Sequence, residues 1–94
     1  MLTHVVCFQF ADQDTAREAR ERLLAMRGRL PALLDIECGL DITRSPRSHD
    51  LALITRHADG AGLAAYGADP VHGEVLVWIK EHAKNVVAVD FLSE

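Results

Sequence analysis

The chain has 94 residues, of which 49% are hydrophobic and 26% charged, and its formal net charge at pH 7 is −4. These values are typical of a folded globular protein and exclude a disordered chain. The length suffices for one hydrophobic core, so we expect a single domain over residues 1–94. The sequence contains no basic patch, and nucleic acid is therefore not an expected partner.

The sequence also lacks the patterns of membrane and secreted proteins. No apolar run approaches the roughly 20 residues of a membrane span. The first residues lead into a strand pattern without the charged start and cleavage site of a secretory signal. Cys7 and Cys38 lie far apart in strand-like runs, which is typical of small buried side chains in a reducing compartment. We therefore expect a cytoplasmic protein that does not bind membranes.

The first half of the chain predicts three strands and one helix. Residues 2–10 alternate in hydrophobicity, as in a strand with one apolar face. Asp12 or Asp14 can cap an amphipathic helix that ends near residues 28–31. Strands are then predicted over residues 34–43 and 50–57, and the short polar turn between them indicates an antiparallel hairpin.

The second half predicts two short helices and a final strand. Pro70 lacks a backbone N–H and disfavours helical geometry in Asp69, so the helix that contains Tyr66 should end near Ala68. A second helix should begin with Asp69 as its N-cap and Pro70 as its first residue, and end near residue 83. Residues 86–91 complete the chain as a strand.

This order of elements predicts an α+β fold of the ferredoxin-like type, a split βαβ arrangement with a four-stranded antiparallel sheet and helices on one face. The other face of the sheet would then be largely apolar, with the side chains of Val5, Cys7, Ala52, Ile54, Val87 and Val89. An uncovered apolar face buries itself against another molecule, so we predict a homodimer that packs sheet to sheet.

Tyr66, His72 and His4 are the candidate site residues. Tyr66 and His72 lie on either side of the predicted helix break, which holds a phenol and an imidazole close together. At the third position of its helix, His72 is near the positive end of the helix dipole, which favours the neutral imidazole that a general base needs. His4 lies on the apolar face of the first strand, where it is either a hydrogen-bonded core residue or a polar contact for a ligand. The spacing of the histidines does not match a zinc site.

Four stretches, residues 2–8, 44–54, 66–72 and 86–91, together resemble the stress-responsive α/β-barrel (Dabb) family over about residues 2–92. The resemblance implies a dimeric ferredoxin-like α/β barrel. Residues 66–72 of the chain are also similar to a segment of a plant polyketide cyclase of that family. By this resemblance Tyr66 would polarise a substrate carbonyl, His72 would remove a proton from the carbon between two carbonyls, and His4 would orient the ligand. Leu51 stands where the cyclase has a further pocket histidine, which makes this pocket less polar.

The interpretation that we favour is a homodimer that binds a small apolar ligand between sheet and helices, without a metal or other cofactor. Its expected ligand-binding residues are His4, Leu51, Phe8, Val75 and Ile79. One alternative is a cofactor-independent polyketide cyclase-like enzyme that acts on a β-dicarbonyl compound, with His72 as base and Tyr66 as hydrogen-bond donor. The others are a cofactor-free monooxygenase of the antibiotic-biosynthesis type and a structural stress protein whose barrel holds nothing.

Overall fold

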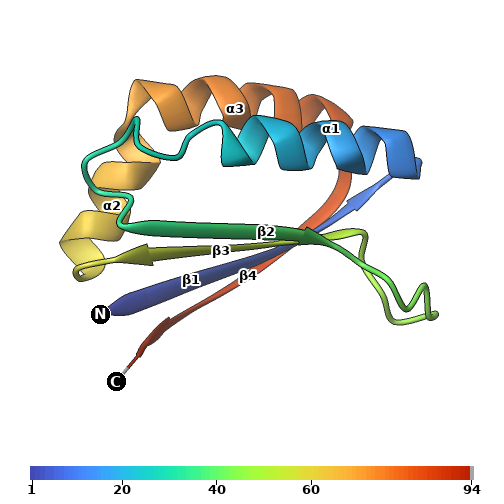
Figure 1. Cartoon of the computed structure of the whole chain (residues 1–94), viewed down its shortest axis with the longest axis horizontal. Helices are drawn as coiled ribbons and strands as arrows, with labels where there is room; N and C mark the ends of the chain where they lie inside the picture. Colours follow the sequence, from blue (N-terminus) through green and yellow to red (C-terminus); the bar gives the residue numbers. More distant parts are fainter. Residues whose placement is uncertain (94) are drawn as a thin grey trace.

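The computed structural model describes residues 1–93, which form one antiparallel sheet with helices on one of its faces (Figure 1). In chain order the elements are β1 (Leu2–Phe10), α1 (Gln13–Leu24), β2 (Asp35–Leu40), β3 (Leu51–His57), α2 (Gly60–Ala68), α3 (Pro70–His82) and β4 (Ala83–Leu92). The sheet order is β2-β3-β1-β4, with β1 in the interior between β3 and β4. The predicted four-stranded ferredoxin-like α+β fold is thus confirmed.

Each helix begins at an aspartate whose side chain accepts a hydrogen bond from a backbone N–H of the first turn. Asp12 accepts from Thr15 at 2.7 Å, Asp59 from Gly62 and Asp69 from Val71, both at 2.8 Å. Asp69 ends α2 and caps α3, and Pro70 is the first residue of α3. The predicted helix break at Asp69 is therefore confirmed.

Three element boundaries differ from the prediction. Helix α1 ends at Leu24, and turns follow through residues 25–29, where Gly28 adopts a φ of 77° that does not fit a helix. Strand β2 stops at Leu40, because the Asp41 carboxylate accepts the backbone N–H of Arg44 and turns the chain. Strand β4 begins at Ala83 without a loop, since the backbone becomes extended at this residue.

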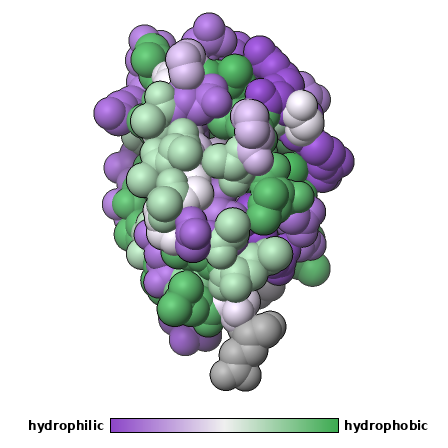
Figure 2. Space-filling model, turned by 90° about the vertical axis from the view of Figure 1, so that its left-hand side faces the viewer, coloured by the Kyte–Doolittle hydropathy of each residue, from purple (hydrophilic) through white to green (hydrophobic). Residues whose placement is uncertain are grey.

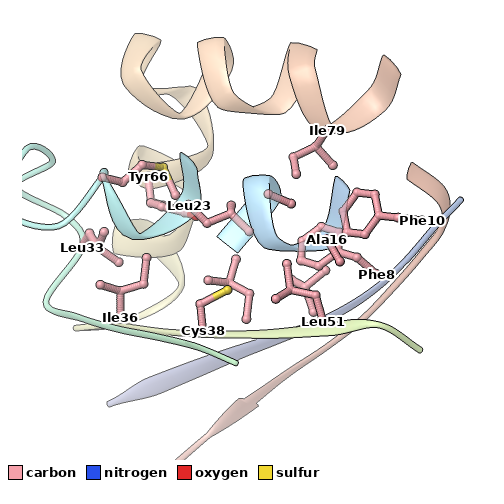
Figure 3. Close-up of a cluster of buried hydrophobic side chains, with 14 of the residues drawn as sticks. Phe8, Phe10, Ala16, Leu23, Leu33, Ile36, Cys38, Leu51, Tyr66 and Ile79 are labelled. Atoms are coloured by element: carbon pink, nitrogen blue, oxygen red, sulfur yellow. The ribbon is translucent and has the colours of Figure 1, made fainter. Parts of the chain in front are cut away.

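The hydrophobic core lies between the helices and the sheet, and Figure 3 shows a large part of it. Ala16, Ala19 and Leu23 on the buried side of α1 pack against apolar side chains of β1, β2 and β3. Ala19 and Met26 are completely buried. The small alanine side chains allow α1 to approach the sheet closely.

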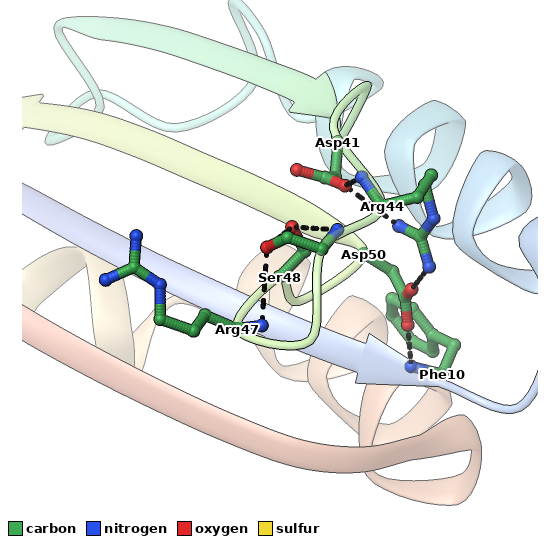
Figure 4. A network of polar contacts seen from close by, with 7 residues as sticks. Phe10, Asp41, Arg44, Arg47, Ser48 and Asp50 are labelled. Atoms are coloured by element: carbon green, nitrogen blue, oxygen red, sulfur yellow. Dashed lines mark hydrogen bonds and ion pairs between the residues drawn. The ribbon is translucent and has the colours of Figure 1, made fainter.

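A polar network closes the end of the sheet near the loop between β2 and β3 (Figure 4). The backbone N–H of Phe10 donates to the buried carboxylate of Asp50 at 2.6 Å, and the guanidinium of Arg44 donates to the other oxygen of Asp50 at 2.6 Å. Arg44 itself adopts a φ of 53°. Its bonds to Asp41 and Asp50 hold this left-handed conformation, which a residue with a Cβ atom disfavours.

The face of the sheet away from the helices is apolar near its centre. In the antiparallel register Val5 pairs with Ile54 on one side and with Val89 on the other, so the three side chains share this face. Val89 is 65% exposed and Phe91 49% exposed. The predicted apolar outer face is therefore present. None of the helices within residues 1–93 has the length and apolar character needed to cross a membrane.

Candidate functional site

A cavity of about 390 Å³ lies between α3 and the strands β1 and β4. Its walls are mainly aliphatic and aromatic, and its polar groups come from four residues. The lining residues are His4, Val6, Phe8, Leu23, Leu53, Tyr66, His72, Val75, Leu76, Ile79, Lys80, Val86 and Ala88. This combination of an apolar chamber with a few polar groups is typical of a small-molecule site.

The helix break brings Tyr66 and His72 together in the wall of the cavity. Their ring centroids are 4.5 Å apart and the ring planes are inclined by 54°. Tyr66 is the buried residue of α2, while α2 exposes Ala61, Ala64, Ala65 and Ala68. Figure 2 shows weakly hydrophobic surface at this end of the molecule. The Tyr66 ring thus provides the main buried contact of α2, and it reaches the cavity from there.

His72 is held in an environment that favours its neutral form. Burial lowers the pKa of His72 and the nearby His4 adds to this effect, while the Gly67 carbonyl and the Asp69 carboxylate oppose it. The buried Nδ1 atom of His72 has no hydrogen-bond partner within residues 1–93. A buried polar atom without a partner is uncommon and costly, and it leaves the hydrogen-bonding capacity of the His72 ring incomplete.

Tyr66 is a hydrogen-bond donor at neutral pH. Burial raises the pKa of Tyr66 to about 12, and the adjacent Cys38 adds to this shift. The phenol therefore stays protonated and can donate its O–H to a ligand oxygen inside the cavity. A neutral base and a protonated donor, side by side in an apolar chamber, can accept a proton from a C–H group and stabilise the resulting enolate oxygen.

His4 lies on the opposite wall, with a partner on the neighbouring strand. Its Nδ1 atom is hydrogen-bonded to the carboxylate of Asp90, the residue that pairs with it in β4. A carboxylate only accepts, so Nδ1 of His4 carries the proton and Nε2 remains available for a ligand. The His4 ring meets Tyr66 edge-on at 6.3 Å between centroids. His4 is therefore both a hydrogen-bonded histidine and a lining residue of the cavity.

His57 supports the site from behind, a role that the sequence interpretation missed. It is completely buried, and its ring lies 4.8 Å from that of Tyr66. Its Nδ1 atom donates to the Ala32 carbonyl at 2.6 Å, so Nε2 accepts from the Thr55 hydroxyl at 2.9 Å. The strand alternation offered a signal, because His57 and Thr55 lie on the helix-facing side together with Leu53.

All but one of the predicted site residues lie in the wall of the cavity. Tyr66, His72, His4, Phe8, Val75 and Ile79 all line the cavity. Leu51 does not line it, which corrects its expected position. Leu51 is buried in the core of β3, where it pairs with Phe8 of β1 and Leu40 of β2, and Leu53 is the residue of β3 that lines the cavity. The sequence interpretation missed Asp90 and Lys80, although Asp90 lies in phase with Val86 and Ala88 along β4.

The side chains of residues 1–93 form no group of three or more histidine, cysteine or acidic residues that could hold a metal ion. The thiols of Cys7 and Cys38 are unpaired within the same residues. The side chains of Tyr66, His72 and His4 carry the groups in the cavity that can form hydrogen bonds, together with the Lys80 ammonium, and the surrounding aliphatic walls can make apolar contacts.

Comparison with known proteins identifies relatives of the same architecture. The family model of the stress responsive A/B barrel domain, Dabb, matches residues 2–93. This match confirms the resemblance noted in the sequence. No curated protein sequence matches the chain.

Solved structures of similar fold come from several organisms. A dimeric ferredoxin-like protein of unknown function from Thermobifida fusca is 23% identical with a TM-score of 0.85, and the match covers 98% of this chain and 90% of that one. A dimeric protein of unknown function from Bacteroides fragilis is 18% identical with a TM-score of 0.85, over 98% and 95% of the two chains. The hydroxynitrile lyase from Passiflora edulis is 11% identical with a TM-score of 0.84, over 99% and 93%. At these identities the likeness establishes the fold.

Proposed function

The chain belongs to the Dabb family of stress responsive A/B barrel domains, and we propose that it binds a small apolar carbonyl compound in the cavity and catalyses proton transfer on it. One observation carries this proposal. The buried Nδ1 atom of His72 has no partner within residues 1–93, and it belongs to a ring that lies 4.5 Å from the protonated phenol of Tyr66. A carbonyl ligand would accept a hydrogen bond from Tyr66, and its acidic C–H group would meet the neutral imidazole of His72.

The expected ligand follows from the shape and chemistry of the chamber. A volume of about 390 Å³ with aliphatic walls suits a small, mainly apolar molecule. The convergence of Tyr66, His72 and His4 at one place suits one or two carbonyl oxygens on that molecule. An unfilled chamber costs packing energy, which supports a binding function over a purely structural one.

The proposed reaction is an enolisation that needs no cofactor. Neutral His72 removes a proton from a carbon next to the carbonyl, and the C–H electron pair forms the C=C bond of the enolate. Tyr66 donates its O–H to the enolate oxygen as negative charge develops there. Where the ligand carries a further carbonyl group several atoms along its chain, the enolate carbon can attack that carbonyl carbon and close a ring, and His72 returns the proton to the new alkoxide.

The functional form that we propose is a homodimer. The apolar outer face of the sheet, which includes Val5, Val89 and Phe91, matches a second copy of itself. Dimeric relatives with the same fold support this assembly. Because the cavity lies on the helix side of the sheet, pairing through the outer face leaves it within each protomer.

Deuterium exchange at C3 of nonane-2,4-dione, measured by rapid mixing in weakly buffered D₂O, tests the proposal. The wild-type protein should accelerate exchange by about 10²–10⁴-fold, the usual range for a positioned general base. His72→Gln should abolish the acceleration, and Tyr66→Phe should reduce it because the enolate loses its donor. His82→Gln, which changes an exposed histidine of α3, is the matched control and should leave the rate unchanged. Exchange at the background rate with wild-type protein would contradict the proposed reaction.

A further inference from the structure

Lys80 provides the one ammonium group among the residues that line the cavity. The side chain is exposed to solvent as well, so its aliphatic part borders the chamber while its charge can remain hydrated. Within residues 1–93 no carboxylate forms an ion pair with Lys80. The structure thus places an uncompensated positive charge at an apolar cavity in a chain whose net charge is −4.

Lys80 and His72 mark two ends of the same cavity wall. The lining residues of α3 are His72, Val75, Leu76, Ile79 and Lys80, a spacing that places them on one helix face. Lys80 comes eight positions after His72, which corresponds to about 12 Å along an α-helix. Between them the helix presents only aliphatic side chains to the cavity.

The wall of the cavity opposite α3 is formed in part by β1 and has a similar length. On β1 the cavity runs from His4 past Val6 to Phe8, which is four positions later and about 13 Å away along a strand. His4 is near Tyr66, whereas Phe8 pairs with Val86, which also lines the cavity. In Figure 3 Tyr66 lies in the left half of the buried cluster, whereas Phe8 and Ile79 lie in the right half. The chamber is therefore polar at the Tyr66 end and apolar along its length, with Lys80 at the far end.

We propose that the ligand of this cavity is an amphipathic anion, with a carbonyl oxygen at Tyr66 and His72, an aliphatic segment along α3, and a carboxylate at Lys80. The separation of about 12 Å corresponds to roughly eight to ten carbon atoms in an extended chain. This inference rests on the proposed function, since it specifies the ligand class of the same site.

Calorimetric titration with two matched ligands tests the inference. The probes are 9-oxodecanoate, which has a ketone and a carboxylate near opposite ends, and its neutral methyl ester. Wild-type protein should bind the acid about three- to ten-fold more tightly than the ester, as expected for a partly exposed ion pair. The preference should decrease at high salt, because ions screen an exposed charge.

Lys80→Gln should remove the preference for the acid, whereas its matched control, Lys84→Gln, should retain it. Lys84 is an exposed lysine of β4 outside the set of lining residues. Equal binding of acid and ester by wild-type protein, or an unchanged preference in Lys80→Gln, would overturn the role of Lys80 while leaving the carbonyl site intact. If wild-type protein binds neither probe, the inference fails together with the binding function proposed for the cavity.

Discussion

The carboxylate of Asp90 is hydrogen-bonded to Nδ1 of His4 across the neighbouring strands β4 and β1. The two residues are 86 positions apart in the sequence and come together through the antiparallel register of the strands at the two ends of the chain. This bond sets the proton of His4 on Nδ1 and the free nitrogen on the other side of the ring. The orientation of one cavity wall therefore depends on the pairing of β1 with β4.

A double-mutant cycle with His4→Gln and Asp90→Asn should show that this pair contributes to stability. We expect a coupling energy of about 0.5–1.5 kcal/mol, since the side chains are only partly buried, 18% and 44% exposed respectively. Urea unfolding of the wild type, the two single variants and the double variant measures it. Additive effects of the two substitutions would show that the pair does not interact in solution.

The protein should become less stable as the pH decreases below about 6.5, and His72 should account for part of this loss of stability. Burial lowers the pKa of His72 in the folded state below its ordinary value of 6.5. The unfolded chain therefore binds this proton first, so the contribution is complete above pH 6.5 and declines as the pH falls toward the folded-state pKa. Thermal unfolding between pH 7.5 and 5 should show a smaller loss in His72→Gln than in the wild type. His82→Gln, at an exposed site, should follow the wild-type curve.

Asp50→Ala should lower the free energy of unfolding by about 2–3 kcal/mol at pH 7, because it leaves the buried N–H of Phe10 without a partner and breaks the bond to Arg44. The bonds from Phe10 and Arg44 outweigh burial and keep the pKa of Asp50 below 3.8. The stabilisation is thus present above pH 3.8 and declines as the pH falls through the lowered pKa.

Asp35→Ala is the comparison for Asp50→Ala in denaturant titrations. The side chain of Asp35 is 61% exposed and pairs with Arg56 at the surface. The substitution should therefore lower the free energy of unfolding by no more than about 1 kcal/mol. Equal losses from the two substitutions would contradict the structural role that we assign to the Asp50 network.

Val89→Lys should dissociate the proposed homodimer. The substitution places a charge near the centre of the apolar outer face, which a second copy would otherwise bury. Sedimentation velocity at micromolar concentration should show a dimer for the wild type and a monomer for the variant. Val77→Lys introduces the same charge at a 59% exposed position of α3 and should remain dimeric. A wild-type monomer at this concentration would exclude the sheet-to-sheet assembly.

Features that depend on neighbouring residues follow from the order of the amino acids. Asp69 and Pro70 end one helix and begin the next through local backbone chemistry, so the proximity of Tyr66 and His72 could be predicted from the chain alone. The alternation along β1 likewise assigned His4 to the helix-facing side of the sheet, since successive side chains of a strand point to opposite faces.

Contacts between residues that are distant in the chain became evident in the folded protein. Asp90 reaches His4 through strand register, and His57 lies behind Tyr66 because α2 packs over β3 near the Ala32 carbonyl. Leu51 faces the helices as predicted by alternation, yet it is buried in the core, and Leu53 of the same strand lines the cavity instead. These relationships depend on the order of strands and on the position of α3 above β1 and β4. Such non-local packing leaves no local pattern in the sequence, because it arises from the combined fit of all the elements.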